Sequence, residues 1–182
     1  MTDVGYPSHQ LKIDPRMVNI RKVTVDDLES LEWDGEYRHF RRTYRENYNR
    51  TLVGTTKMWI MTHRLDLTIG QLFVQLNSNN HTLADGRHRA YIFSFRIRKE
   101  FRSQGLGTYF LNFAEDDLLH HGYKIITLNV AQTNHRALKL YEQNGYHVIG
   151  PDPGIWSYQN DDGEWIKMEE PAWRLEKNLV LA

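Results

Sequence analysis

The sequence of 182 residues predicts an α+β (mixed α/β) protein in which helices flank one sheet, because the spacing of its apolar residues changes along the chain. Apolar side chains alternate in 68–76 and 88–98, which is typical of strands with one buried face. Across 105–122 they recur on one face of a helix, and alternation returns at 124–130. This order favours an antiparallel group of strands that leads into a helix and a further strand.

The remaining elements are assigned from caps, turns and periodicity, and the principal elements follow the order β-α-α-β-β-β-α-β-α-β-β. The turn sequence Asn160-Asp161-Asp162-Gly163 predicts a hairpin near the end of the chain. We expect strands at 17–23, 58–62, 68–76, 88–98, 124–130, 146–149, 156–159, 164–168 and 172–177, and helices from Thr24 or Asp26 to Trp33 and at 36–50, 105–122 and 134–143.

Two regions of different character divide the chain. Residues 1–16 are polar and contain Pro7 and Pro15, so we expect a tail. No linker rich in Pro, Gly or Ser interrupts residues 17–182, which we expect to form a single domain. The N-terminus lacks the apolar segment of a signal peptide, and no stretch reaches the roughly 18 apolar residues of a membrane span. A cytoplasmic protein without membrane contacts is the expectation.

Charge and cysteine content exclude several kinds of chemistry. The 23 basic and 23 acidic residues balance, so no overall field favours nucleic acid. The chain has no cysteine, which excludes disulfides, thiolate metal sites and a cysteine nucleophile. Nine histidines are present, but neither the pair His120-His121 nor His135 has a pattern that requires a metal, and we assign none.

An anion-binding turn is the first functional signal. Gly105 and Gly107 lie where the strand at 88–98 gives way to a helix, and Arg102 and Thr108 lie on the same turn. Unpaired backbone N–H groups and the helix dipole favour a phosphate at such a place. The alternative interpretation is a tight turn beside a solvated arginine. The third glycine of a dinucleotide motif and the Gly-Lys-Ser/Thr of a P-loop are absent.

A second segment makes the pattern specific. Arg102-x-x-Gly105-x-Gly107 resembles the acyl-CoA pyrophosphate motif of the GNAT superfamily of N-acetyltransferases. The segment Asn134-His-Arg-Ala137-Leu138-Lys-Leu140-Tyr141-Glu-Gln-Asn-Gly145-Tyr146 is similar to the Asn-x-x-Ala-x-x-Leu-Tyr-x-x-x-Gly-Phe segment of that family, with one aromatic residue exchanged at its end. The resemblance covers roughly 17–177 and is strongest over 95–146.

The resemblance implies a fold and a co-substrate. The fold would be a central, mostly antiparallel sheet of about six to seven strands with helices on both faces. Acetyl-CoA, or another acyl-CoA, would bind with its pantetheine arm along the backbone of 95–97 and its pyrophosphate on the amides of 104–108. The cofactor-binding residues implied in this way are Phe95, Arg96, Ile97, Arg102, Ser103, Gln104, Gly105, Leu106, Gly107, Thr108 and Asn134. For Asn134 a helix cap is the compatible alternative.

The resemblance also implies a reaction, the transfer of an acetyl or other short acyl group to a primary amine. Tyr141 would be the catalytic residue and would protonate the departing thiolate, although it also fits a core position in its helix. A backbone N–H near Ile97 would polarise the thioester carbonyl. Because there is no cysteine, we expect direct attack in a ternary complex and no covalent acyl-enzyme.

The general base is not evident in the sequence. The strand at 88–98 carries no carboxylate, where some members of the family have a glutamate. A chain of water molecules, Glu36 or Asp85 are the alternatives.

Other functions stay open at this point. One is an acyl-CoA-binding sensor or scaffold without catalysis. Another is a protein that contacts nucleic acid through a basic face of the helix at 36–50, which carries Arg38, Arg41, Arg42 and Arg45; the same face is also compatible with an acidic acceptor or with a solvated surface. The aromatic hairpin at 156–168 would either form a homodimer contact or wall the acceptor site.

Overall fold

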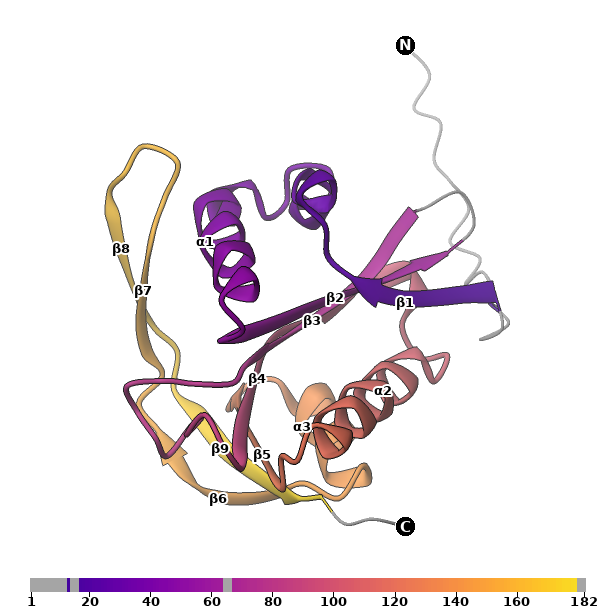
Figure 1. The fold of residues 1–182 in the computed structure, drawn as a ribbon, viewed down its shortest axis with the longest axis vertical. Helices are drawn as coiled ribbons and strands as arrows, with labels where there is room; N and C mark the ends of the chain where they lie inside the picture. The colour runs from indigo at the N-terminus through magenta and orange to yellow at the C-terminus, as the bar shows by residue number, and fades with distance from the viewer. Residues whose placement is uncertain (1–12, 14–16, 64–66, 180–182) are drawn as a thin grey trace.

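The computed structural model describes residue 13 and residues 17–63 and 67–179, and its centre is a seven-stranded sheet (Figure 1). The strand order is β1-β2-β3-β4-β5-β9-β6. Within this sheet β4 and β5 run parallel and the other neighbours are antiparallel. The predicted α+β class with a mostly antiparallel sheet is therefore confirmed. The strands are β1 (Val18–Lys22), β2 (Thr56–His63), β3 (Leu67–Gln75), β4 (Arg89–Ile97), β5 (Ile125–Ala131), β6 (His147–Asp152) and β9 (Ala172–Asn178).

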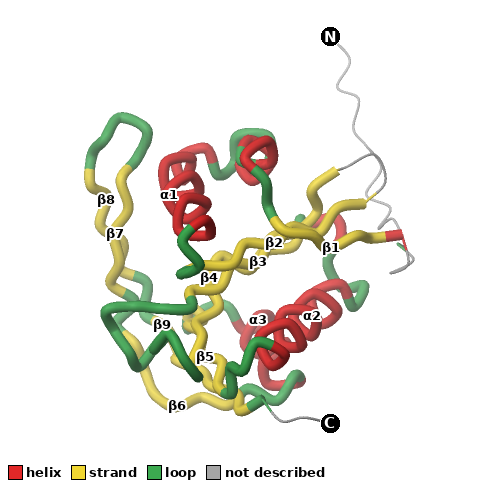
Figure 2. Tube along the Cα trace, viewed as in Figure 1, coloured by secondary structure: helices red, strands yellow, loops and turns green. Residues whose placement is uncertain are grey.

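Helices cover both faces of the sheet, as Figure 1 shows and Figure 2 repeats by element type. On one face lies α1 (Arg41–Leu52), and on the other lie α2 (Leu106–His120) and α3 (His135–Gln143). Gly105, before α2, and Gly122, after it, have positive φ angles of 79° and 88°. These left-handed positions favour glycine and fix both ends of α2.

The two faces of the sheet bury two separate cores. In β2, Trp59 and Met61 face the α2 and α3 layer, whereas Met58 and Ile60 face α1. Because its neighbouring side chains are buried on opposite faces, β2 reads as a continuous apolar segment rather than an alternating one. The sheet is thus the middle layer of three.

The N-terminal helices differ from the prediction. The segment from Thr24 to Trp33 forms two short 3₁₀ turns, Val25–Asp27 and Glu29–Glu32, instead of one α-helix. The expected start of the next helix at Glu36 is wrong, because α1 begins at Arg41 after a 3₁₀ turn. The backbone of 37–40 accounts for the later start: Tyr37 (φ −113°, ψ 22°) and Phe40 (φ −97°, ψ 5°) depart from α-helical angles, and Arg38–Phe40 form the 3₁₀ turn.

A separate hairpin stands beside α1 on the same side of the sheet. Strands β7 (Ile155–Gln159) and β8 (Trp165–Glu169) pair through the predicted turn at 160–163. The hairpin contacts the start of α1 through aromatic rings: the Phe40 centroid lies 4.8 Å from that of Tyr158 and 6.0 Å from that of Trp156. This contact holds the hairpin against the body of the protein.

Two expectations concern the N-terminal tail and membrane-spanning segments. The tail at 1–16 lies outside the described residues except for Ile13, so the division into a tail and one domain stays a prediction. Within the described part of the chain, none of the helices has both the length and the apolar character needed to cross a membrane.

Candidate active site

The site begins where β4 and β5 separate. Their parallel pairing extends from Arg89↔Ile125 to Ile92↔Leu128 and goes no further along either strand. Beyond this point β5 stays paired with β9 and β4 stays paired with β3. The edge of 93–97 that faces β5 therefore presents backbone N–H and C=O groups without a strand partner, and such groups need hydrogen bonds from another source.

A bulge in β4 directs side chains at this edge to opposite sides. The register with β3 shifts between Gln71 and Phe73, and Ser94 has a φ of 52°. The extra residue changes the direction of the side chains after it. Phe95 then packs on Phe110 of α2, with ring centroids 5.9 Å apart, while Arg96 points to the α1 layer.

The turn before α2 has the geometry of an anion site. The Tyr109 N–H donates to the Gly105 carbonyl at 2.9 Å, so the amides before it in this first turn have no intrahelical acceptor. A Cβ on Gly105 would meet no atom within 4 Å, which shows open space at this position. A Cβ on Gly107 would lie 3.3 Å from Leu140 Cδ2, so Gly107 allows α2 and α3 to approach each other. Nearby, Arg102 Nε donates to the Ile97 carbonyl at 2.7 Å.

A cavity of about 660 Å³ lies over this turn, between the free edge of β4 and α3. Ten expected site residues line it, namely Phe95, Arg96, Ile97, Arg102, Ser103, Gly105, Gly107, Thr108, Asn134 and Tyr141. Two others do not reach it with their side chains. Leu106 is buried in the core, and the Gln104 Oε1 accepts from the Ile13 N–H at 2.8 Å. Those two residues have only backbone groups to offer a ligand.

The structure adds cavity residues that the sequence reasoning missed. Arg136 and Lys139 bring positive charge from α3, and Arg136 donates to the Ser103 hydroxyl at 3.2 Å. The helical spacing of α3 places 136, 139, 140 and 143 near one face, and this period was a signal available in the sequence. Tyr37, Ala137, Leu140 and Gln143 complete the lining. The cations suit a ligand with several phosphate groups.

Asn134 has both of the roles considered for it. Its Oδ1 accepts from the Ala137 N–H at 3.1 Å, which makes it the N-cap of α3. It also lines the cavity. The two interpretations are compatible because the cap uses one side-chain oxygen and leaves the amide N–H groups available.

Tyr141 is a core residue that also reaches the cavity. Its ring lies 6.4 Å from that of Phe95 and 5.6 Å from that of Tyr146. Burial raises the pKa of Tyr141, and the nearby Tyr91 raises it further. Among the described residues no group hydrogen-bonds its hydroxyl. A protonated hydroxyl at the wall of a cavity is available as a proton donor.

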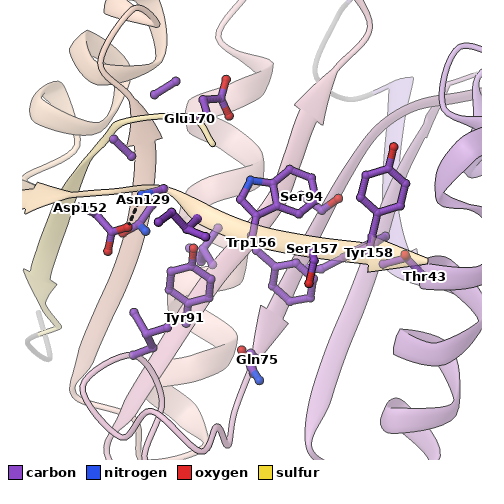
Figure 3. A pocket seen from close by; sticks show the side chains of 18 of the residues that line it. Thr43, Gln75, Tyr91, Ser94, Asn129, Asp152, Trp156, Ser157, Tyr158 and Glu170 are labelled. Carbon is purple, nitrogen blue, oxygen red and sulfur yellow. Dashed lines mark hydrogen bonds between the residues drawn. The ribbon is translucent and has the colours of Figure 1, made fainter. Parts of the chain in front are cut away.

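A second cavity, of about 610 Å³, lies on the α1 side of the sheet. Figure 3 shows part of its lining, with Asn129, Asp152 and Glu170 toward one end and Thr43 and Tyr158 toward the other. Arg96 lines both cavities, so they adjoin at this residue of β4. The aromatic side chains of its walls are Phe40, Tyr44, Phe73, Tyr91, Phe93, Trp156 and Tyr158.

One of the two carboxylates at the acidic end of this second cavity, that of Asp152, is neutralised. Asp152 forms an ion pair with Arg174 and also accepts from the Gly154 N–H at 2.8 Å. Burial raises the pKa of Tyr91 to about 12, with a further contribution from Asp152. Tyr91 therefore stays a neutral hydroxyl at ordinary pH.

Neither base suggested by the sequence reaches the cavities. Glu36 and Asp85 are absent from both linings. Burial acts to raise the pKa of Asp85, but N–H donors from Arg89, His88 and Arg87 outweigh it and hold the pKa at about 2. Asp85 thus has little affinity for a proton at neutral pH.

The other functions considered from the sequence gain little from the structure. On α1, Arg41 forms an ion pair with Glu32 at 2.5 Å, and Arg38 lies 3.7 Å from Asp161, so the basic face is partly neutralised. No group of three His, Asp or Glu side chains in the described ranges is placed to hold a metal.

The hairpin has its aromatic residues in two different settings. Trp156 and Tyr158 line the second cavity, and their role as a wall of the acceptor site stays a prediction. Trp165 is 71% exposed, and the homodimer contact stays a prediction.

The chain belongs to the Acetyltransferase (GNAT) family, whose sequence model matches residues 21–146. An uncharacterised N-acetyltransferase of Archaeoglobus fulgidus is 26% identical over an alignment of 133 residues, with 68% of this chain and 89% of that protein covered.

Solved structures share the fold at low identity. The ribosomal-protein-S18-alanine N-acetyltransferase of Escherichia coli superposes with a TM-score of 0.68 at 19% identity, over 91% of this chain and 96% of that one. A GNAT acetyltransferase of Elizabethkingia anophelis with acetyl-CoA bound gives 0.62 at 13% identity, over 90% and 99%. At these identities the likeness is one of fold.

Proposed function

We propose that this protein transfers an acetyl or other short acyl group from acyl-CoA to a primary amine, by direct attack within a ternary complex. The supporting observation is that two cavities adjoin at Arg96, in the part of β4 that is no longer paired with β5. One cavity has a helix N-terminus and cations suited to phosphates, and the other opens on the opposite side of the sheet. A thioester between them would be accessible to an amine.

Each part of the first cavity has a task in this proposal. The free amides of the α2 turn, with Arg102, Arg136 and Lys139 nearby, bind the phosphate groups. The unpaired edge of 95–97 binds the pantetheine amides and presents an N–H to the thioester carbonyl. Asn134 contacts the same arm.

Tyr141 supplies the proton for the leaving sulfur. During transfer a nitrogen–carbon bond forms, the carbon–sulfur bond breaks, the amine loses a proton to a chain of water molecules, and the thiolate gains one from Tyr141. The buried, neutral phenol of Tyr141 is suited to the last of these steps because its raised pKa keeps it protonated.

The cofactor site is tested by calorimetric titration of acetyl-CoA into matched glycine variants. Gly105 and Gly122 have φ angles of 79° and 88°, and a Cβ at either meets no atom within 4 Å. Gly105→Glu and Gly122→Glu therefore share backbone strain and charge but differ in position. We expect Gly105→Glu to weaken binding by about 30-fold or more, because it places a carboxylate against phosphate, and Gly122→Glu to bind as the wild type does. Equal binding by both folded variants would reject this location for the cofactor.

The reaction is tested by the release of free CoA with a panel of primary amines. A ternary mechanism gives intersecting double-reciprocal lines, and intact-protein mass spectrometry after exposure to acetyl-CoA alone shows no added acyl group. Tight acetyl-CoA binding with no release of CoA in the presence of any amine would favour the sensor function instead.

A further inference from the structure

The side chain of Arg96 is held at the border between the two cavities. Its guanidinium carbon lies 4.2 Å from the centroid of Tyr37 and 5.5 Å from that of Phe40. One terminal nitrogen donates to the Tyr44 hydroxyl at 3.2 Å and to the Ser94 hydroxyl at 3.1 Å. All of these contacts are to neutral groups. They fix the position of the cation without compensating its charge.

Arg102 and Arg136 also have only neutral partners, but they lie at the phosphate end of the first cavity. Three other arginines differ from Arg96 in this respect. Arg174 is paired with Asp152, Arg98 with Asp34 at 2.8 Å and Arg41 with Glu32. For Arg96, by contrast, no carboxylate of the described residues comes within 4.0 Å. Its remaining guanidinium N–H groups have no acceptor among those residues either. A positioned, partly buried cation with unused donors is a site for an anion.

The walls of the second cavity indicate what the anion is attached to. The cation meets aromatic side chains on the α1 side, including Phe40, and the lining continues across Phe93 to Trp156. The carboxylates Asp152 and Glu170 lie toward the end of the cavity away from Thr43 (Figure 3). A ligand here would have an apolar or aromatic body with its anionic group near β4.

We propose that Arg96 binds a carboxylate on the acceptor, so that the acceptor is an amino acid with an apolar or aromatic side chain and a free α-carboxylate. This assignment rests on the proposed acyl transfer and identifies its substrate class. Arg96 lies on the strand that would present the thioester, so a carboxylate bound to it brings the α-amino group, two bonds away, near the reacting carbon. The cation also lowers the pKa of the bound amine, which increases its neutral fraction.

The test compares substrates that differ only in this charge. Phenylalanine, leucine and methionine are each paired with their primary amides, and kcat/KM is measured by CoA release with acetyl-CoA saturating. We expect each acid to exceed its amide by about 30-fold, the effect of one charge-assisted bidentate contact. Equal rates for acid and amide, or faster reaction of the amides, would overturn the proposal.

Variants connect the preference to Arg96. Arg96→Gln removes the charge and should bring the acid-to-amide ratio close to unity, whereas Arg96→Lys should retain part of the ratio because it keeps the charge without the planar fork. Arg87→Gln is the matched control, because Arg87 is an exposed loop residue that lines neither cavity, and it should leave the ratio as in the wild type. A ratio that survives in Arg96→Gln would contradict the assignment.

A binding measurement separates this proposal from the acyl transfer itself. N-acetylphenylalanine and N-acetylphenylalaninamide are titrated into the protein saturated with CoA. Tighter binding of the acid that is lost in Arg96→Gln supports the anion site even if no amine is acetylated. Acetylation of amines without such a difference supports the acyltransferase and rejects the anion site.

Discussion

The two cavities of this protein are built in different ways. The first cavity, which we propose as the acyl-CoA site and call the cofactor cavity, comes from two continuous stretches, 95–108 and 134–143, with Tyr37 added from elsewhere. The second cavity, which we propose as the acceptor site and call the acceptor cavity, is lined by residues of α1, the loop before β4, the central strands β4 and β5, the hairpin and β9. A site made from a strand, a turn and a helix depends on local geometry, whereas a site assembled from distant segments depends on tertiary packing. Changes to the second cavity should therefore leave the first one working.

The largest effect is expected at Tyr141, which belongs to the cofactor cavity. Tyr141→Phe keeps the ring that packs on Phe95 and removes only the hydroxyl. We expect kcat to fall about 100-fold, as for loss of a general acid, with acetyl-CoA affinity nearly unchanged. Tyr109→Phe, an exposed position on α2, is the control.

The pH dependence of kcat adds a second readout for Tyr141. Because burial raises its pKa, the phenol stays protonated above the usual tyrosine value of about 10, so this group should cause no loss of kcat near that pH. Unchanged kcat in Tyr141→Phe would assign the residue to the core alone.

A smaller effect, confined to the acceptor cavity, is expected at Gly154. A Cβ there would lie 1.7 Å from the Glu170 carbonyl oxygen, so Gly154→Ala forces the base of the hairpin apart. We expect about 10-fold lower kcat/KM for the amine, with acetyl-CoA binding retained, as calorimetry and initial rates can show.

The hairpin tip supplies the matched control. Gly163 also has a positive φ, of 83°, but a Cβ there meets only the flexible end of Arg42 at 3.5 Å and that of Gln159 at 4.0 Å. Gly163→Ala should introduce backbone strain similar to that in Gly154→Ala, but without displacing the hairpin residues that line the acceptor cavity. Equal losses of acetyl-CoA binding and amine turnover in Gly154→Ala would show that the two cavities are not independent.

The smallest effect is expected at Asp85, in the loop that carries Asn80 and Leu83 to the acceptor cavity. Its Oδ1 accepts backbone N–H groups of residues 87, 88 and 89 at 2.8 to 2.9 Å. Asp85→Ala should lower the free energy of unfolding by about 1 kcal/mol in urea denaturation and raise the amine KM a few-fold.

The stability difference at Asp85 should depend on pH in a defined direction. The folded pKa of about 2 lies below the ordinary value of 3.8, so the stabilisation is fully present above 3.8 and is lost as pH falls through 2. Wild type and Asp85→Ala should therefore converge in acid. A difference that persists at the lowest pH would point to packing rather than to the carboxylate.

The same contrast explains how much the sequence could predict. The sequence could place Gly105, Gly107 and Asn134 at the first cavity because the elements that carry them follow one another along the chain. Arg136 and Lys139 were missed although the helix that carries them was predicted. The start of α1 was placed too early because no local sequence pattern marks 37–40 as departing from the α-helical conformation.

The acceptor cavity could not be predicted from local patterns in the sequence. Arg96 was assigned a backbone role, and its side-chain direction follows from the bulge at Ser94, which no periodicity signals. The aromatic hairpin was noted as one wall, but its partner on α1 depends on how distant segments pack.

The short pairing between β4 and β5 also bears on how the sheet can deform. Within the described sheet, β4 pairs with β5 only from Arg89 to Ile92. The sheet therefore consists of two parts, β1 to β4 and β5 with β9 and β6, which this short pairing joins. Backbone hydrogen bonds hold paired strands in place, and the pairing of β4 with β5 has few of them. Tilting of the two parts of the sheet relative to each other would change the width of the gap at 93–97, so the short pairing places the site where such a motion would act on it.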